Sequence, residues 1–140
     1  MKTRLNNEAE TRVFAADFAK SLNPGDCVAL SGELGAGKSV FARALMRALG
    51  VTDEAMPSPT FSLIQEYAGK TCKIAHMDWY RLGSPEEIET LGVYEYFQPP
   101  WITIIEWPER APSLLADTVV KIRLENVDDF PDARLISLAG

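Results

Sequence analysis

The chain carries the octapeptide Gly32-Glu33-Leu34-Gly35-Ala36-Gly37-Lys38-Ser39, which matches the phosphate-binding pattern G-x-x-x-x-G-K-[ST] at every specified position. Glycines in such a loop let the backbone adopt positive φ, so that several N–H groups form one concave anion site at the start of a helix. The lysine of the pattern reaches the β- and γ-phosphates of a nucleotide, and the hydroxyl after it binds Mg²⁺. The octapeptide therefore predicts a nucleotide site, with Lys38 on the phosphates and Ser39 on the metal.

The sequence on both sides of the loop has the context that this pattern requires. An apolar, strand-like run from Cys27 to Leu30 precedes it, and apolar residues recur at helical spacing after it until Gly50, which is suited to end a helix. A glycine-rich turn without a ligand is the alternative. We expect a nucleotide to contact the loop and the first helical turn, at Glu33, Leu34, Gly35, Ala36, Gly37, Lys38, Ser39 and Val40.

Length, charge and cysteine content limit the class of protein. A chain of 140 residues predicts a single domain over residues 1–140 with a substantial core. A net charge of −6 argues against general attraction to nucleic acid, so any RNA connection is expected to be indirect. Cys27 and Cys72 are interpreted as buried free thiols rather than a disulfide or metal site. The sequence has neither an apolar run of about 18 residues nor a leader, so we expect no membrane segment and a cytoplasmic location.

Helix and strand patterns continue on both sides of the loop. Two prolines make residues 56–60 a stiff loop, because neither has an N–H donor and each favours extended geometry in the residue before it. Ser84-Pro85-Glu86-Glu87 has the residues of a helix N-terminus, so its glutamates are interpreted as capping residues. We expect helices over 7–22, 38–49 and 84–92, an antiparallel hairpin of strands 61–67 and 71–77, and further strands over 27–31, 101–105, 118–125 and 133–138.

Two carboxylates, Asp78 and Glu106, each come directly after an apolar strand. Open α/β sheets bind their ligands at the carboxyl ends of strands, so we expect both acids beside the phosphate loop. Asp78 is the better candidate to bind the metal, directly or through water. Glu106 could hold a metal-bound water or orient the attacking water, and the two roles could be exchanged. In the alternative, either acid only caps its strand or pairs with Arg81 or Arg110.

Thr60 and His76 are the other polar residues near these strands that could serve a nucleotide. Thr60 stands on the proline-stiffened loop, where many nucleotide-binding proteins carry a threonine that contacts Mg²⁺ and responds to the γ-phosphate; simple turn chemistry is the alternative. His76 is expected to face the side of its strand opposite Asp78 and is interpreted as structural. The candidate catalytic residues are Lys38, Thr60, Asp78 and Glu106, and the candidate metal ligands are Ser39, Asp78 and Glu106.

Missing motifs narrow the choice of nucleotide and reaction. The sequence has no [NT]-K-x-D segment to read guanine, which favours ATP over GTP. It also has no long arginine-rich stretch where a small-molecule kinase would place a lid over its acceptor. An ATPase is therefore the main hypothesis, with a small-molecule P-loop kinase and a non-catalytic nucleotide-sensing adaptor as alternatives.

With these residues assembled, the chain resembles the TsaE family, also called YjeE, the small bacterial ATPases of tRNA threonylcarbamoyladenosine biosynthesis. The phosphate loop is generic, whereas the blocks downstream are specific in combination. They are Ser58-Pro59-Thr60-Phe61 with Glu66-Tyr67, His76-Met77-Asp78-Trp79-Tyr80-Arg81-Leu82, Glu95-Tyr96-Phe97 and Glu106-Trp107-Pro108-Glu109.

The resemblance implies an α/β P-loop NTPase fold of three layers, with a mixed, largely parallel sheet flanked by helices. It implies that Thr11 lies on the adenine side of the nucleotide and that Trp107 lies beside the site, with ATP or ADP and Mg²⁺ as cofactors. It further implies TsaB and TsaD as partners, whose assembly ATP turnover resets during modification of adenosine 37 in tRNAs that read ANN codons. Ser39 replaces the commoner threonine, and Tyr94 occupies a place that is often acidic in relatives.

Overall fold

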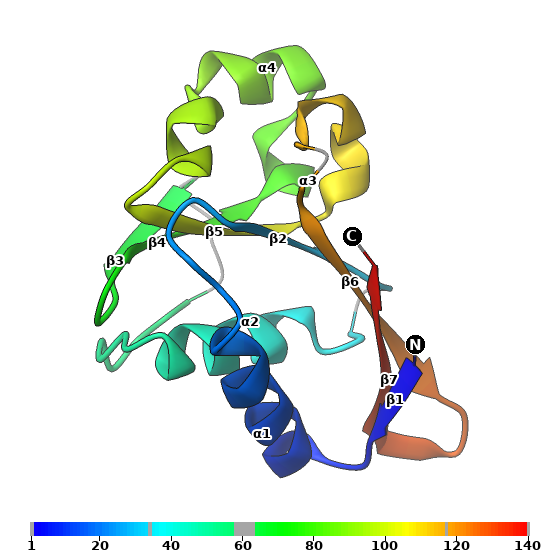
Figure 1. Ribbon diagram of the computed structural model, residues 1–140. Helices are drawn as coiled ribbons and strands as arrows, with labels where there is room; N and C mark the ends of the chain where they lie inside the picture. Colours follow the sequence, from blue (N-terminus) through cyan, green and yellow to red (C-terminus); the bar gives the residue numbers. More distant parts are fainter. Residues whose placement is uncertain (1, 34, 58–63, 117, 140) are drawn as a thin grey trace.

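The structure is a computed structural model that describes residues 2–33, 35–57, 64–116 and 118–139. Within these ranges the strands are β1 (Lys2–Leu5), β2 (Cys27–Ser31), β3 (Ile64–Ala68), β4 (Lys73–Asp78), β5 (Trp101–Glu106), β6 (Val120–Val127) and β7 (Phe130–Ala139). They form one sheet in the order β1-β7-β6-β2-β5-β4-β3 (Figure 1). The four central strands β6, β2, β5 and β4 are parallel, whereas β3, β7 and β1 each run antiparallel to the neighbour that joins them to the sheet.

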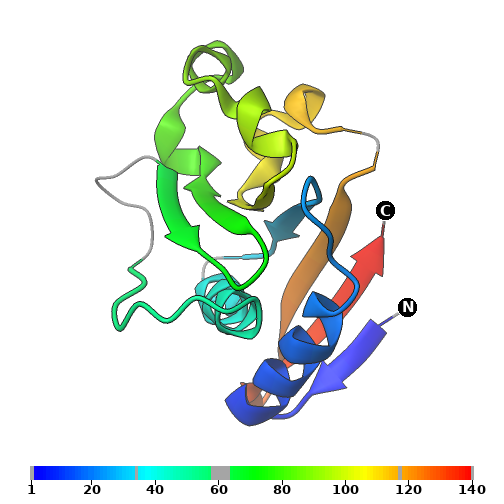
Figure 2. The same cartoon turned by 60° about the vertical axis from the view of Figure 1, so that its left-hand side comes forward.

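Helices cover both faces of this sheet, as Figures 1 and 2 show. The long helices α1 (Glu8–Ala19) and α2 (Lys38–Ala48) pack together on one face. Short helical segments cover the other face: α3 (Trp79–Leu82), α4 (Pro85–Thr90) and the 3₁₀ turns η1 (Val93–Phe97), η2 (Pro108–Arg110) and η3 (Pro112–Leu114). The expected three-layer α/β fold with a mixed, largely parallel sheet is confirmed.

Two apolar cores lie on opposite sides of the sheet because successive strand residues point to opposite faces. On β4 and β5, Ile74 and Ile104 enter the core under α1 and α2, whereas Ala75, Met77 and Ile105 enter the core under the short helices. The central strands are buried on both faces, which is why they read as continuous apolar runs. This burial holds the carboxyl ends of β2, β4 and β5 in fixed relative positions.

Most of the expected elements form, with altered ends. The first helix begins after Asn7, whose side chain caps Glu10 N, and it ends at Ala19 rather than at residue 22. The antiparallel hairpin forms as β3 and β4, and Ser84 and Glu87 make a reciprocal capping box at the start of α4. The short strand β1 and the single turn α3 were not expected from the sequence, because each is too short to show a period.

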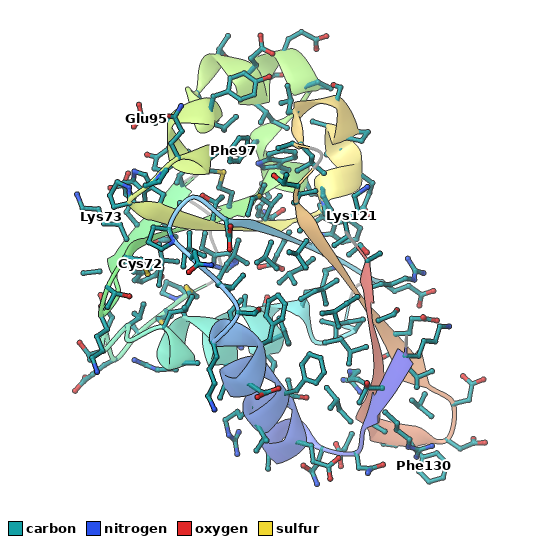
Figure 3. The ribbon with its side chains drawn as sticks, in the orientation of Figure 1. Cys72, Lys73, Glu95, Phe97, Lys121 and Phe130 are labelled. Carbon is teal, nitrogen blue, oxygen red and sulfur yellow. The ribbon has the colours of Figure 1, made fainter. Side chains whose placement is uncertain are left out.

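The described residues also bear on the membrane and thiol expectations. Among them, no helix combines the length and the apolar character needed to cross a membrane. Cys27 is buried and Cys72 is half-buried, and both are free thiols. Cys72 lies beside Lys73, on the side of the molecule far from Phe130 (Figure 3).

Candidate functional site

The phosphate loop connects the end of β2 to the start of α2 and depends on glycine. Gly32, Gly35 and Gly37 have φ values of 146°, 82° and 92°, which side-chain-bearing residues rarely adopt. At Gly32 the loop also passes so close to β6 that an added Cβ would lie 2.4 Å from the Leu124 carbonyl oxygen. Gly37 is the N-cap of α2 and provides no side-chain cap, so the N-terminal N–H groups of this helix remain directed at the loop.

Lys38 is buried within the loop that it follows. Its ammonium donates to the carbonyl oxygens of Gly32, at 2.5 Å, and Glu33, at 3.5 Å, and lies 3.7 Å from the centre of the Trp107 ring. Burial lowers the pKa of Lys38, while the carboxylates of Glu106, Glu109 and Asp78 act in the opposite direction. The ammonium is thus held at the loop, where the effect of burial on its pKa exceeds that of the three carboxylates.

Asp78 and Glu106 are brought together by the parallel pairing of β4 and β5, in which they occupy the same register position. Burial and the nearby Glu106 charge raise the pKa of Asp78, even though Asp78 also caps α3 and lies 3.7 Å from Arg81 Nε. The Ser39 hydroxyl donates to Glu106 Oε1 across 3.5 Å. The structure therefore places both strand-end acids beside the start of α2, and Asp78 has the capping and arginine contacts as well.

The expected orientation of His76 was wrong. Residues 76 and 78 are two apart, so their side chains share one face of β4 rather than lying on opposite faces. The His76 ring accordingly points to the site, where its Nε2 lies 2.7 Å from Glu106 Oε2. The period of a strand was the signal in the sequence that should have placed His76 with the acids.

An aromatic stack lies next to the two acids. Trp107 follows Glu106 with φ of 60°, a left-handed conformation that is rare for a large residue. This conformation ends β5 and places the indole against the Lys38 ammonium on one side and Tyr80 on the other, with ring centres 5.4 Å apart. Arg110 stacks on Tyr80 at 5.2 Å. Trp107 thus lies beside Lys38 of the phosphate loop, and its place next to a nucleotide stays a prediction.

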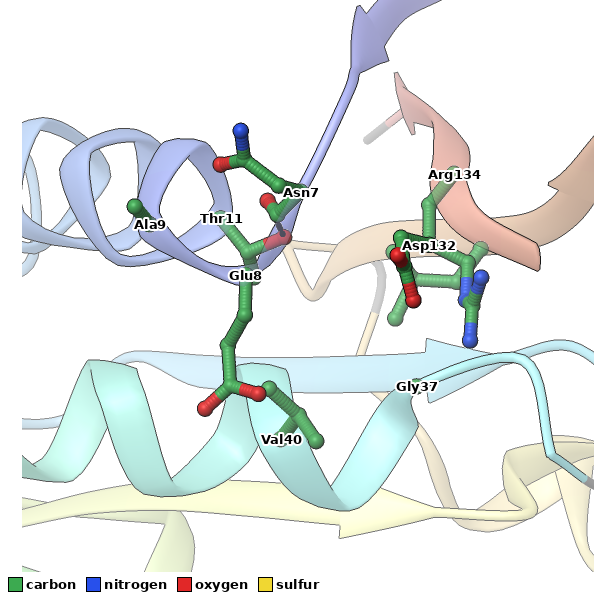
Figure 4. A pocket seen from close by; sticks show the side chains of 9 residues that line it. Asn7, Glu8, Ala9, Thr11, Gly37, Val40, Asp132 and Arg134 are labelled. Carbon is green, nitrogen blue, oxygen red and sulfur yellow. Dashed lines mark hydrogen bonds between the residues drawn. The ribbon is translucent and has the colours of Figure 1, made fainter. Parts of the chain in front are cut away.

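A cavity of about 380 Å³ opens beside the phosphate loop, between α1, α2 and β7 (Figure 4). Thr11, implied by the resemblance to lie on the adenine side, is one of its lining residues. Gly37 and Val40 join the cavity to the loop and to the first turn of α2. The full lining is Asn7, Glu8, Ala9, Thr11, Gly37, Val40, Leu124, Asp132 and Arg134.

Arg134 is a residue of this site that the sequence reasoning missed. From β7 it donates to the Ala36 carbonyl oxygen at 3.0 Å and to that of Gly35 at 3.4 Å, and it lines the cavity. It is separated from the loop by about a hundred residues of sequence, so no local pattern relates the two. Only the pairing of β7 with β6, and of β6 with β2, brings it there.

The donor set at the acids fits Mg²⁺. One hydroxyl and two carboxylates, on Ser39, Asp78 and Glu106, are hard oxygen donors. Burial, and after it the Glu106 charge, raises the pKa of Asp78, and a cation at the acids would offset both effects. In the part of the chain that the structure describes, no group of three or more His, Cys, Asp and Glu side chains is arranged to hold a metal alone.

Two predicted site residues, Leu34 and Thr60, lie outside the described residues, as does the block from Ser58 to Phe61. Their predicted roles stay predictions. The other predicted site residues all lie at the loop, at the two strand ends or along the cavity.

Comparisons with known proteins identify a family that this chain is similar to. Residues 5–135 match the family described as Threonylcarbamoyl adenosine biosynthesis protein TsaE. The tRNA threonylcarbamoyladenosine biosynthesis protein TsaE of Rickettsia bellii (strain RML369-C) is 40% identical over 139 residues, covering 99% of this chain and 94% of that protein. The protein of the same name from Bacillus subtilis (strain 168) is 35% identical over 129 residues, covering 92% and 80% of the two chains.

The fold has a solved counterpart. The crystal structure of Bacillus subtilis YdiB superposes on this chain with a TM-score of 0.81 and 30% sequence identity, covering 99% of this chain and 83% of the other. Similarity of sequence and of fold thus extends over nearly the whole chain. The chain belongs to the TsaE family of threonylcarbamoyl adenosine biosynthesis proteins and has a P-loop NTPase fold.

Proposed function

We propose that the chain is a Mg²⁺-dependent ATPase that acts as a nucleotide-controlled switch in the formation of threonylcarbamoyladenosine at position 37 of tRNAs reading ANN codons. Its partners are subunits of the TsaB and TsaD type, and it contacts tRNA only through them. The net charge of −6 supports an indirect contact with RNA. The names of the relatives support the part of the proposal that concerns tRNA modification, and the residues at the phosphate loop support the part that concerns ATP hydrolysis.

The observation that carries the ATPase proposal is the meeting of four side chains at one edge of the sheet: Lys38, Ser39, Asp78 and Glu106. A phosphate loop without acids would support binding alone, because hydrolysis also needs a metal holder and a group that orients water. Ser39 and Asp78 hold the metal, and Glu106 holds a metal-bound water or orients the attacking one. Because Asp78 and Glu106 lie opposite each other on β4 and β5, the reverse assignment, with Glu106 at the metal and Asp78 at the water, also fits the structure.

Each remaining residue has a defined part in this proposal. Bound Mg²⁺ supplies charge neutralisation at the phosphates. The loop backbone from Glu33 to Gly37 cradles the phosphates through its N–H groups, and Lys38 releases its carbonyl partners to stabilise negative charge on them. Thr60 contacts the metal side and responds to the γ-phosphate. Thr11 and Val40 receive the adenine along the cavity, and Trp107 closes the opposite side of the loop.

The central test compares Lys38→Ala with Lys121→Ala, which removes an exposed lysine of β6 (Figure 3). Loss of the buried ammonium should lower ATP turnover roughly a hundredfold, because a preorganised cation at the phosphates is absent. Turnover is measured as phosphate release with Mg²⁺ and both partner subunits. Unchanged ATP binding and turnover in Lys38→Ala would contradict the proposal.

The same assay separates the alternatives. Transfer of the phosphoryl group to an added nucleoside, sugar or cofactor instead of water would favour a small-molecule kinase. ATP binding without turnover, even with TsaB and TsaD present, would favour a nucleotide-sensing adaptor.

The switch is tested by co-purification with TsaB and TsaD in ATP and in ADP, followed by an assay of modified tRNA. We expect the extent of association to differ between the two nucleotides. If the chain co-purified with neither partner in ATP or in ADP, the proposed switch would be contradicted, whereas the proposed nucleotide site would not be affected.

A further inference from the structure

We propose that His76 is a positioning residue that holds the Glu106 carboxylate in the orientation needed at the metal. Its Nε2–H donates to one carboxylate oxygen, Oε2, and the other oxygen, Oε1, faces Ser39. This inference rests on the proposed ATPase function and assigns a role to a residue which that function does not use.

The contact between the two side chains is short and shielded from water. His76 Nε2 lies 2.7 Å from Glu106 Oε2, and the side chains are 1% and 7% exposed. In the proposed pair His76 Nε2–H is the donor, because a carboxylate only accepts hydrogen bonds. The other ring nitrogen, Nδ1, is buried and has no hydrogen-bond partner among the described residues. Among the described residues, Glu106 is therefore the hydrogen-bond partner that this ring has.

The carboxylate needs such a partner because its charged neighbours act on it in opposite directions. Lys38 is close enough for Glu106 to favour its charged form, and Asp78 is close enough for Glu106 to disfavour its ionisation. A hydrogen bond from a buried ring fixes one oxygen, so the second oxygen stays directed at Ser39.

His76 is well placed to act as a rigid donor. It lies on β4 opposite Ile104 of β5, two residues before the register pair of Asp78 and Glu106. Both strands are central and buried, so the distance between the ring and the carboxylate is set by the sheet rather than by a loop. A histidine that only filled space would be replaceable by any side chain of similar size.

The first measurement uses the unmodified protein. His76 is the only histidine of the chain, so its ring nitrogens give unambiguous signals in a ¹⁵N-resolved NMR spectrum. We expect a proton on Nε2. A ring that carries its proton on Nδ1 alone would overturn the inference, because Nε2 could then not donate to Glu106.

The second measurement compares His76→Gln, whose amide N–H can approach the position of Nε2, with His76→Leu, which fills space without a donor. A fluorescent ADP analogue is titrated in EDTA and at a series of Mg²⁺ concentrations. Both variants should bind the analogue like the unmodified protein in EDTA. His76→Leu should need about 10-fold more Mg²⁺ for half of the magnesium effect, and His76→Gln should recover most of that loss. Equal losses in two variants of equal stability would overturn the inference.

A double-substitution cycle then tests whether His76 acts through Glu106. In a Glu106→Ala background, where no side-chain oxygen remains to accept from His76, His76→Leu should produce no further change in the Mg²⁺ requirement. The same fold-loss in both backgrounds would indicate a general structural role and overturn the inference. If the unmodified protein binds the ADP analogue in a magnesium-dependent way but releases no phosphate from ATP with TsaB and TsaD present, the proposed ATPase is contradicted and this role of His76 stands. Absence of magnesium-dependent binding would overturn both.

Discussion

Lys38 has contacts on its ammonium that a bound phosphate would compete for. Two carbonyl oxygens and the Trp107 ring surround the ammonium, at 2.5, 3.5 and 3.7 Å. Burial lowers the pKa of Lys38, so an approaching anion would favour the charged form and strengthen its own binding. A phosphate that binds Lys38 would replace the carbonyl oxygens as partners of the ammonium. The environment of the Trp107 indole would change at the same time.

This exchange predicts a fluorescence response from one of the three tryptophans. Addition of ATP with Mg²⁺ should change the tryptophan emission of the unmodified protein, because the cation leaves or shifts over the Trp107 ring. Trp107→Phe should abolish most of the response. Trp101→Phe is the matched control, since Trp101 stacks on Tyr96 away from Lys38, and it should retain the response. An equal response in both variants would contradict the prediction.

At the scale of elements, the phosphate loop is held by the strands of the C-terminal hairpin as well as by its own glycines. Gly32 lies against the Leu124 carbonyl of β6, and Arg134 of β7 donates to the carbonyls of Gly35 and Ala36. Neighbouring chain segments therefore constrain the loop from outside. The loop geometry depends on contacts that the octapeptide does not contain.

Two glycine substitutions should separate contact from backbone strain. Gly32→Ala places a methyl group 2.4 Å from a backbone oxygen at a φ of 146°, and should lower the free energy of unfolding by about 3 to 5 kcal/mol. At Gly35 a Cβ meets no atom of the described residues within 4 Å, so Gly35→Ala should cost only about 1 kcal/mol for its positive φ. Urea unfolding measures both. A larger loss at Gly35 would show that the loop packs differently.

The hairpin contact predicts that Arg134→Ala weakens nucleotide binding without unfolding the protein. Loss of the two charged donors frees the carbonyls of Gly35 and Ala36 and should raise the dissociation constant for ATP about 10-fold, with a loss of stability of about 1 to 2 kcal/mol. Arg123→Ala is the control, because Arg123 is exposed on β6 and forms an ion pair with Glu125. Calorimetric titration and urea unfolding give the two values. Equal affinity in both variants would contradict a role of Arg134 at the loop.

At the scale of the whole molecule, the sheet separates two cores, and Cys27 lies in the core under the short helices. Burial raises the pKa of Cys27 to about 12 and also raises that of the half-buried Cys72. Because the reactive form of a thiol is the thiolate, Cys27 in the folded protein is protected by its ionisation as well as by its burial. Its reaction therefore reports opening of the molecule.

Alkylation at pH 8 should modify Cys72 first and Cys27 only through unfolding. ATP with Mg²⁺ should slow the reaction of Cys27, because a ligand that binds the folded state lowers the unfolded population. Peptide mass mapping over time distinguishes the two thiols. Reaction of Cys27 as fast as Cys72, or unaffected by nucleotide, would contradict the prediction.

The same thiol gives the stability a pH dependence of known sign. The pKa of Cys27 is higher in the folded state than in the unfolded state, so the unfolded chain loses its proton first as pH rises above about 8.5. Stability from the neutral thiol is therefore present below that pH and is lost toward pH 12. Between pH 7.5 and 10 the unmodified protein should lose about 1 to 2 kcal/mol more than Cys27→Ala in urea unfolding. Parallel losses in the two proteins would contradict this.

Elements with a strong local signature are predictable from the sequence of this chain. The phosphate loop, the strand before it, the capping box of α4 and the antiparallel pairing of β3 and β4 all follow from residues close together in the chain. β1 and α3 are too short to carry a period. The placement of His76 toward Glu106 was recoverable from strand alternation.

The sequence by itself determines which chemical groups the site contains. A phosphate loop and the acids that follow apolar strands are each made of neighbouring residues, whose conformations depend mainly on one another. The assembly of that site is a property of the folded sheet. Parallel pairing of β4 with β5 sets Asp78 opposite Glu106, and the hairpin of β6 and β7 delivers Arg134 to a loop about a hundred residues earlier. Such contacts join distant segments through strand register, and register is fixed by packing across the whole molecule rather than by any one stretch of sequence.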